Sequence, residues 1–258
     1  MVTPKVIANQ FRRHGFALVD EFLSPDEVDH LQDELTRYVD QVVPRLDPRH
    51  VFYEQEHKVL IKHLTSPDLY DDYYKEMLNR PATLEVVQAC LGTPAEPISS
   101  EVFYKHARVG TETPYHQDNA YFLCHPDDDV ITAWIALDDV DESNGCLRYI
   151  EGSHLGPILN HEPLPNEGYN KVPAVELIDL KKETAACVKK GGVVFHHCKT
   201  LHTSHRNNSS NWRRGYATHW VSDRVVSEND TIKNGYFHAH EDLYQATIAE
   251  LTSRSTSL

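Results

Sequence analysis

The sequence lacks the features that would place the protein in or beyond a membrane. It holds no apolar run near the ~18 residues that a helical membrane span requires. Its first residues, MVTPKVIANQFRRHGF, contain no apolar stretch typical of a secretory signal. Its five cysteines are scattered, odd in number and never spaced Cys-x-x-Cys, which favours free thiols in a reducing compartment over a disulfide framework. We therefore expect a cytoplasmic protein.

Positive charge is also scarce. The 258 residues include 25 Lys and Arg against 39 Asp and Glu, which gives a formal net charge of −14. A field of this sign repels phosphate backbones and anionic lipid surfaces, so we expect neither a nucleic acid nor a membrane as a partner. The expected partner is a small-molecule substrate, and the sequence is compatible with both a monomer and a homodimer.

The first hundred residues predict mainly helices. A short apolar run at residues 16–19 predicts a strand, and Ser24 then provides the N-cap of a helix. Apolar residues at helical spacing follow this N-cap until Pro44 ends the helix. A second helical stretch covers residues 68–91, with a break at Pro81.

From about residue 98 the sequence changes to short runs rich in Val, Ile, Thr and aromatic residues, separated by Gly, Asn, Asp and Pro clusters. This pattern predicts a mainly β fold with flanking helices (α+β): a double-stranded β-helix, or cupin-like jelly roll, with N-terminal helices packed on one sheet. We find no internal repeat or interdomain linker, so we expect a single domain over residues 1–258. Its expected parts are a helical part (1–97), a jelly-roll core (98–225) with a long insertion (153–190), and a C-terminal segment (226–258).

The stretch PYHQDNAYF contains a histidine and an aspartate two residues apart. On a strand such residues share a face, so His116 and Asp118 are candidates to bind one metal ion. A distal histidine would complete a 2-His-1-carboxylate triad, which leaves three positions of an octahedral iron(II) open. Two alternatives are a zinc site that involves Cys198 and a hydrogen-bonded pair without a metal. The candidates for the distal histidine are His196, His197, His202 and His205.

The open positions of such a triad suit O₂ and a bidentate co-substrate such as 2-oxoglutarate. The distal carboxylate of 2-oxoglutarate needs a buried cation, and a guanidinium matches its planar shape. NWRRGYATHW offers Arg213 and Arg214 at the start of a predicted strand. Adjacent residues on a strand face opposite sides, so only one of the two can enter a pocket. The alternative is that both are surface charges.

Taken together, these motifs resemble the phytanoyl-CoA dioxygenase family of iron(II)- and 2-oxoglutarate-dependent oxygenases. The resemblance begins at HGFALVDEFLSPDEVDHL and continues through PYHQDNAYF, ITAWIALDDVDESNGCLRYIEGSH and GGVVFHHCKTLHTSHRNN. It implies an enzyme that uses Fe(II), 2-oxoglutarate and O₂. Such a dioxygenase hydroxylates or otherwise oxidises an unactivated C–H bond and releases succinate and CO₂. The net charge of −14 favours a small soluble metabolite as its substrate.

The resemblance also implies roles for particular residues. It makes His116, Asp118 and His202 the iron ligands and the catalytic residues. It places His197 directly behind these ligands. The residues that it places against 2-oxoglutarate are Arg213, Ser204, Trp134 and Lys62.

The resemblance leaves the substrate open. Its expected contacts are the aromatic residues beside the first motif and a histidine that departs from the family pattern, namely Tyr115, Tyr121, Phe122 and His205. Halogenases on this scaffold replace the aspartate ligand by a small residue, so Asp118 favours hydroxylation. Three other functions remain: a cupin-like metal-binding protein or isomerase without oxygen chemistry, a degenerate family member that serves as a regulator or structural partner, and an acyl-CoA hydroxylase of the same family. The weak visible absorption of an anaerobic iron(II)–2-oxoglutarate chelate distinguishes an oxygenase from the first of these.

Overall fold

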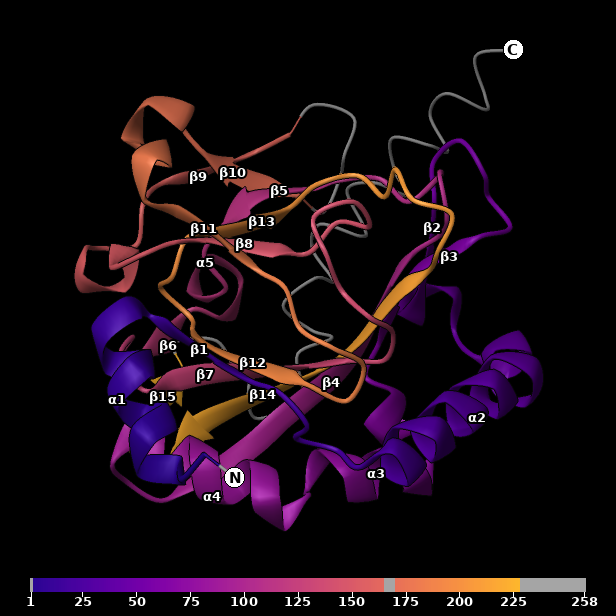
Figure 1. The fold of residues 1–258 in the computed structure, drawn as a ribbon, viewed down its shortest axis with the longest axis horizontal. Coiled ribbons are helices and arrows are strands. Elements are labelled where there is room, and N and C mark those ends of the chain that lie inside the picture. The colour runs from indigo at the N-terminus through magenta and orange to yellow at the C-terminus, as the bar shows by residue number, and fades with distance from the viewer. Residues whose placement is uncertain (1, 165–169, 228–258) are drawn as a thin grey trace.

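Two antiparallel sheets form the core of the protein (Figure 1). The computed structural model describes residues 2–164 and 170–227. The larger sheet has seven strands, which are in spatial order β1 (Phe16–Val19), β12 (Val193–His197), β7 (Val130–Ala136), β14 (Arg213–Ser222), β4 (Ala95–Lys105), β3 (Ile61–Thr65) and β2 (Val51–Tyr53). The predicted mainly β fold is confirmed.

The smaller sheet has four strands, in the spatial order β11 (Glu183–Ala186), β8 (Leu147–Ile150), β13 (His202–Ser204) and β5 (Thr113–His116). Two further strand pairs join β9 (His161–Pro163) to β10 (Lys171–Pro173), and β6 (Cys124–His125) to β15 (Val226–Ser227). The insertion expected at residues 153–190 thus contains the β9–β10 pair and also β11, which extends the smaller sheet. The C-terminal segment expected at residues 226–258 lies almost entirely outside the described residues.

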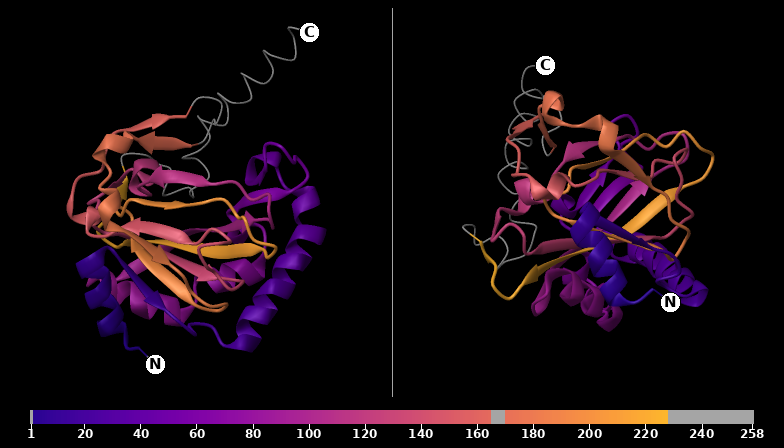
Figure 2. Two further views of the ribbon diagram at one scale, coloured as in Figure 1. Left: turned by 45° about the horizontal axis from the view of Figure 1, so that its top comes forward. Right: turned by 60° about the vertical axis from the view of Figure 1, so that its left-hand side comes forward.

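The helices gather on the outer face of the larger sheet, as Figures 1 and 2 show from three directions. They are α1 (Pro4–His14), α2 (Pro25–Gln41), α3 (Asp72–Leu78) and α4 (Pro81–Leu91), and a short α5 (Asn119–Phe122) lies apart from them beside the smaller sheet. Apolar residues of α1 to α4 form one buried cluster with residues of β7, β12 and β14. The N-terminal helices therefore pack on one sheet, as predicted. Among the described residues, no helix combines the length and apolar character that crossing a bilayer requires.

Local signals explain the boundaries of α2. The Ser24 hydroxyl accepts a hydrogen bond from the Glu27 backbone N–H, and the Glu27 carboxylate accepts one from the Ser24 N–H, which together form a capping box. The helix ends at Gln41, three residues before Pro44. The predicted start is confirmed, but the helix ends before Pro44, which instead lies in the short 3-10 helix Val43–Arg45.

Alternation along the strands divides the side chains of the larger sheet between two environments. On β7, Ile131, Ala133 and Ile135 belong to the cluster beneath the helices. Thr132 and Trp134, at the intervening positions, face the space between the two sheets and line a pocket there. The sheet thus uses one face for its core and the other for polar and aromatic side chains that surround this pocket.

We expect substitution of Gly215 by alanine to destabilise the protein, because Gly215 allows Trp134 to lie against the backbone of β14. An added Cβ would come within 2.0 Å of Trp134 Cζ2, so the indole would have to move. Overpacking of this kind costs about 1–3 kcal/mol, which urea denaturation of Gly215→Ala should detect. Gly156→Ala is the matched control, since its new Cβ would meet only the Ser153 carbonyl oxygen at 3.4 Å. Equal midpoints for the two variants would contradict this account.

Candidate metal centre and adjoining pocket

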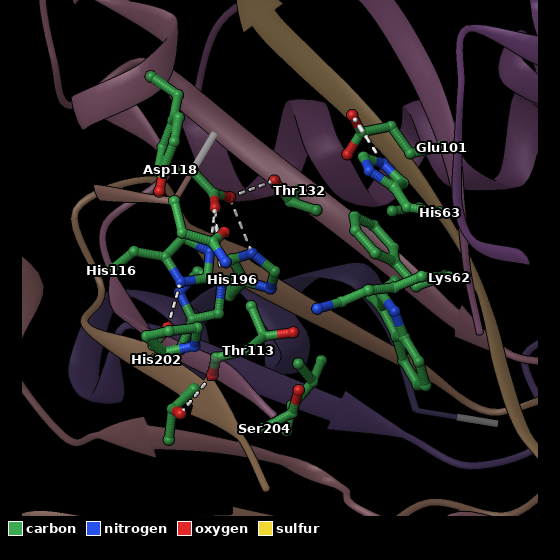
Figure 3. Close-up of a pocket in the computed structure, with 18 of the residues that line it drawn as sticks. Lys62, His63, Glu101, Thr113, His116, Asp118, Thr132, His196, His202 and Ser204 are labelled. Carbon is green, nitrogen blue, oxygen red and sulfur yellow. Dashed lines mark hydrogen bonds and ion pairs between the residues drawn. The ribbon is translucent and has the colours of Figure 1, made fainter. Parts of the chain in front are cut away.

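Three side chains converge on one point between the two sheets (Figure 3). His116, Asp118 and His202 each offer one ligand atom, and these atoms lie within 4.8 Å of one another. His116 is the last residue of β5 and His202 the first of β13, and the two are direct partners in the antiparallel pairing of these strands. The sequence-predicted metal ligands are therefore brought together by sheet pairing.

His116 and Asp118 are close together, but not because they share one face of a strand, as expected from the sequence. The prediction placed both on one face of a strand, but β5 ends at His116. Asp118 has helical backbone angles (φ −55°, ψ −39°) and immediately precedes α5. A change from strand to helix, not strand alternation, turns the carboxylate towards the histidine.

Backbone carbonyls fix the orientation of both imidazoles. His116 Nδ1 lies 2.8 Å from the Pro114 carbonyl oxygen, and His202 Nδ1 lies 2.9 Å from that of Thr200. Each Nδ1 must donate to its carbonyl, so the lone pair of each neutral ring lies on Nε2 and faces the shared centre. Burial lowers the pKa of both histidines to about 4, which keeps the rings neutral and available as ligands at neutral pH.

The Asp118 carboxylate presents one oxygen to the centre and has its other oxygen engaged. Oδ1 lies 3.7 Å from His116 Nε2 and 3.5 Å from His202 Nε2. Oδ2 accepts hydrogen bonds from the Thr132 hydroxyl at 2.8 Å and from His196 Nε2 at 3.0 Å. Burial acts to raise the pKa of Asp118, but His202 and His196 outweigh it and hold the pKa well below its ordinary value. The carboxylate is therefore ionised.

The histidine behind the metal ligands is His196, which corrects the prediction of His197. Because Asp118 Oδ2 accepts from His196 Nε2, His196 Nδ1 is the acceptor for the Tyr149 hydroxyl at 2.9 Å. His197 faces the other side of β12, where it stacks on Phe11 of α1 at a centroid distance of 5.6 Å. Strand alternation sends one of the two adjacent histidines to each face.

The donor set fits iron(II). Two neutral imidazoles and one carboxylate are the ligands of non-haem iron(II) sites with open positions. The alternative with Cys198 finds no support in this geometry, because the Cys198 thiol contacts the Asp127 carbonyl oxygen at 3.0 Å and is outside the group of convergent ligand atoms. A structural zinc site would need a fourth protein ligand, and the described residues offer none in this group.

The residues expected against 2-oxoglutarate line the same pocket as the metal ligands, and Lys62 extends into it (Figure 3). Arg213 is 2% exposed and lies over the Trp134 ring, 5.1 Å from its centroid. Its Nε and Nη2 donate to the Gly145 carbonyl oxygen at 3.0 and 2.7 Å. Ser204, from β13, also lines this part of the pocket. A buried guanidinium whose hydrogen bonds within the described chain go only to a carbonyl fits the carboxylate of a ligand.

The adjacent arginines face opposite sides of β14, as their spacing requires. Arg214 points away from the pocket and forms a bidentate ion pair with Asp138, with distances of 2.9 Å from Nε to Oδ2 and 2.7 Å from Nη2 to Oδ1. Burial lowers the pKa of Arg213 to about 10, which leaves this guanidinium charged at neutral pH. Of these two adjacent arginines, it is therefore Arg213 that places its charge inside the pocket.

Two of the four expected substrate contacts line the pocket. These are Tyr121 and Phe122, which α5 holds beside the metal ligands. Tyr115 lies outside the pocket lining because its neighbour His116 on β5 takes the inner face, and its hydroxyl donates to Glu183. His205 is exposed and is also outside the lining.

The sequence reasoning missed Lys105, a pocket residue that is only 4% exposed. It lies at the end of β4, next to Arg213 across the strand pairing. The sequence did contain a signal for this residue. Lys105 lies in the strongly β-forming run ISSEVFYKHARV and directly follows Tyr104, which is buried in the cluster beneath the helices, so alternation turns Lys105 to the opposite face of the strand.

A model of the phytanoyl-CoA dioxygenase family matches residues 11–215 of this chain. The peroxisomal phytanoyl-CoA dioxygenase of Bos taurus is 29% identical over 170 residues, which cover 65% of this chain and 47% of that protein. The chain spans about half the length of this relative and of its Homo sapiens counterpart.

Solved structures show the same fold. EvdO2 from Micromonospora carbonacea var. aurantiaca is 26% identical, with a TM-score of 0.68 over 87% of this chain and 92% of that one. The epimerase SnoN, in complex with Fe3+, alpha ketoglutarate and nogalamycin RO, is 21% identical, with a TM-score of 0.72 over 90% of this chain and 88% of that one. These similarities confirm the predicted cupin-like jelly roll.

We expect Thr132→Val to weaken metal binding without unfolding the protein. The substitution keeps the shape of the side chain but removes the hydroxyl that donates to Asp118 Oδ2, so the carboxylate is held less firmly. Loss of such a supporting hydrogen bond typically lowers metal affinity about 10- to 100-fold, which an anaerobic iron(II) titration measures. Thr132→Ser keeps the hydroxyl and should retain most of the affinity. Equal affinities for the valine variant and the wild type would contradict this role.

Proposed function

The chain belongs to the phytanoyl-CoA dioxygenase family, and we propose that it is an iron(II)- and 2-oxoglutarate-dependent dioxygenase. Its proposed reaction is hydroxylation of an unactivated C–H bond in a small soluble metabolite, with release of succinate and CO₂. One observation carries the proposal. A 2-His-1-carboxylate set and a buried arginine without a carboxylate partner in the described chain line one pocket.

His116 Nε2, His202 Nε2 and Asp118 Oδ1 would hold the iron. Bound together with 2-oxoglutarate and O₂, iron(II) supplies the oxidising chemistry that protein side chains lack. The epimerase SnoN shares the fold, and its solved structure contains Fe3+ and alpha ketoglutarate. The contribution of this chain is to keep both imidazoles neutral and oriented.

The co-substrate would lie between the metal ligands and Arg213. The guanidinium has donors left beyond those given to Gly145, and they would bind the distal carboxylate as a planar pair. The Ser204 hydroxyl and the Lys62 ammonium would add hydrogen bonds to the same co-substrate. The Trp134 ring would pack against its carbon chain and exclude water from it.

The substrate would occupy the side of the pocket nearest Tyr121 and Phe122. The Tyr121 hydroxyl accepts a hydrogen bond from the Lys171 N–H at 2.8 Å and donates to the Lys171 carbonyl oxygen at 3.1 Å. These two bonds tie β10 to the segment that carries Asp118, and Lys171 of β10 also lines the pocket. A small metabolite is favoured over an acyl-CoA thioester because the chain carries a net charge of −14.

The direct test is coupled turnover. Purified protein with iron(II), ascorbate and 2-oxoglutarate should form succinate, and the rate should rise with those members of a metabolite panel that are themselves hydroxylated. His116→Ala removes an iron ligand and should abolish both products, whereas His205→Ala alters an exposed histidine outside the pocket and should keep them. Wild-type levels of succinate and hydroxylated product from His116→Ala would refute the proposal.

We expect Arg213→Met to raise KM for 2-oxoglutarate more than it lowers kcat. The substitution removes the donors for the distal carboxylate and leaves the metal ligands intact, so the loss should be about 10-fold or more in KM. Steady-state succinate formation measures both constants. Arg214→Met is the matched control, because Arg214 pairs with Asp138 outside the pocket. The expectation fails if both variants show the same KM.

A further inference from the structure

Lys105 and Arg213 are two buried basic residues that lie next to each other in the pocket. They are direct partners across β4 and β14, and side chains at directly opposed positions project from the same face of a sheet. Their exposed fractions are 4% and 2%, and both line the pocket that contains the metal ligands. Two like charges at opposed positions are destabilising, and burial adds to the cost unless an anion joins them.

The protein partners of Lys105 are neutral. Its Nζ lies 2.5 Å from the Thr111 carbonyl oxygen and 3.2 Å from that of Ser204. Within residues 2–164 and 170–227, neither Lys105 nor Arg213 forms an ion pair with a carboxylate. The position next to these two basic groups therefore suits the carboxylate of a ligand.

A neutral amine at Lys105 has enough N–H donors for both of its hydrogen bonds to the protein. An uncharged amine has two N–H hydrogens, which match the two carbonyl oxygens of Thr111 and Ser204. The ammonium form adds a third donor. Ser204, whose carbonyl already contacts Lys105, also lines the pocket. The third donor would thus join the Ser204 hydroxyl and the Arg213 guanidinium around one anion.

The surroundings of Lys105 favour its neutral amine as long as no anionic ligand is bound. Burial is the main cause, and Arg213 from β14 and Lys62 from β3 add to it, so the pKa of Lys105 lies well below its ordinary value. Glu54 and Glu112 act in the opposite direction. The Glu54 carboxylate is already engaged by the Thr111 N–H at 3.1 Å and the Thr111 hydroxyl at 2.7 Å. An arriving carboxylate would change this balance because it favours the charged form.

We propose that Lys105 binds the distal carboxylate of 2-oxoglutarate together with Arg213, and that its amine takes up a proton when this carboxylate arrives. The proposal rests on the proposed function and names a residue that the sequence motifs did not single out. The step is a simple protonation: the amine nitrogen forms one N–H bond with a proton released by the buffer. Binding of the co-substrate is therefore linked to pH.

Calorimetry of the full-length, iron(II)-loaded protein without oxygen tests the proposal. Titration with 2-oxoglutarate in buffers of different ionisation enthalpy, on the alkaline side of neutrality, should give an uptake of up to about one proton per site. Pyruvate, which keeps the chelating end but lacks the distal carboxylate, should give none. In Lys105→Met the uptake should disappear and 2-oxoglutarate should bind about 10- to 100-fold more weakly, while pyruvate affinity stays the same.

Lys199→Met is the matched control, because Lys199 is also a buried lysine (8% exposed) but pairs with Asp127 and Asp128 outside the pocket. It should keep the wild-type proton uptake. Lys105→Gln provides a second variant if the methionine variant folds poorly, and the wild-type titration decides the linkage by itself. Absence of net uptake in the wild type, or uptake that persists in a Lys105 variant, overturns the proposal. Failure of the iron-loaded wild type to bind 2-oxoglutarate at all would instead refute the proposed function.

Discussion

The pairing of β13 with its two neighbours is the constraint on which the metal centre depends. His202 lies directly opposite His116 on β5 and opposite Tyr149 on β8. Because side chains alternate along a strand, a shift of one residue would turn Thr203 inwards and remove an imidazole from the centre. The pairing of β5 with β13 becomes irregular between His202 and Ser204, immediately after this pair. The two histidine ligands are thus fixed by sheet pairing between segments more than eighty residues apart in the sequence.

The larger sheet makes a different contribution. Thr132 on β7 and His196 on β12 hold the outer oxygen of Asp118. Thr132 also contacts His219 on β14 at 2.9 Å, and His219 lies 3.2 Å from the buried Glu101 on β4. The smaller sheet therefore supplies the imidazoles, and four neighbouring strands of the larger sheet orient the carboxylate. Iron affinity then depends on how the two sheets close on each other, since neither sheet contains the complete arrangement.

Sequence patterns predicted those features whose causes are local. The capping box at Ser24 located α2, and alternation correctly required that Arg213 and Arg214 face opposite sides. Features that depend on three-dimensional context were mispredicted or missed. Deciding which of two adjacent histidines faces Asp118 requires the register of β12, because neighbouring residues on a strand face opposite sides. That register places His196, and not His197, behind Asp118. Lys105 was missed because only the pairing of β4 with β14 reveals that it lies beside an arginine.

A net charge of −14 is compatible with a pocket that suits an anion, because surface charges and buried charges act over different distances. Charges at the surface are screened within about 8–10 Å at physiological salt, whereas buried charges interact through a medium of lower polarity. The two buried carboxylates of the pocket, Asp118 and Glu101, are already engaged by histidines. Lys105 and Arg213 have no carboxylate partner within the described residues, so the local field favours an anion. A large negative charge thus argues against extended polyanions as partners, while the pocket remains suited to a small dicarboxylate.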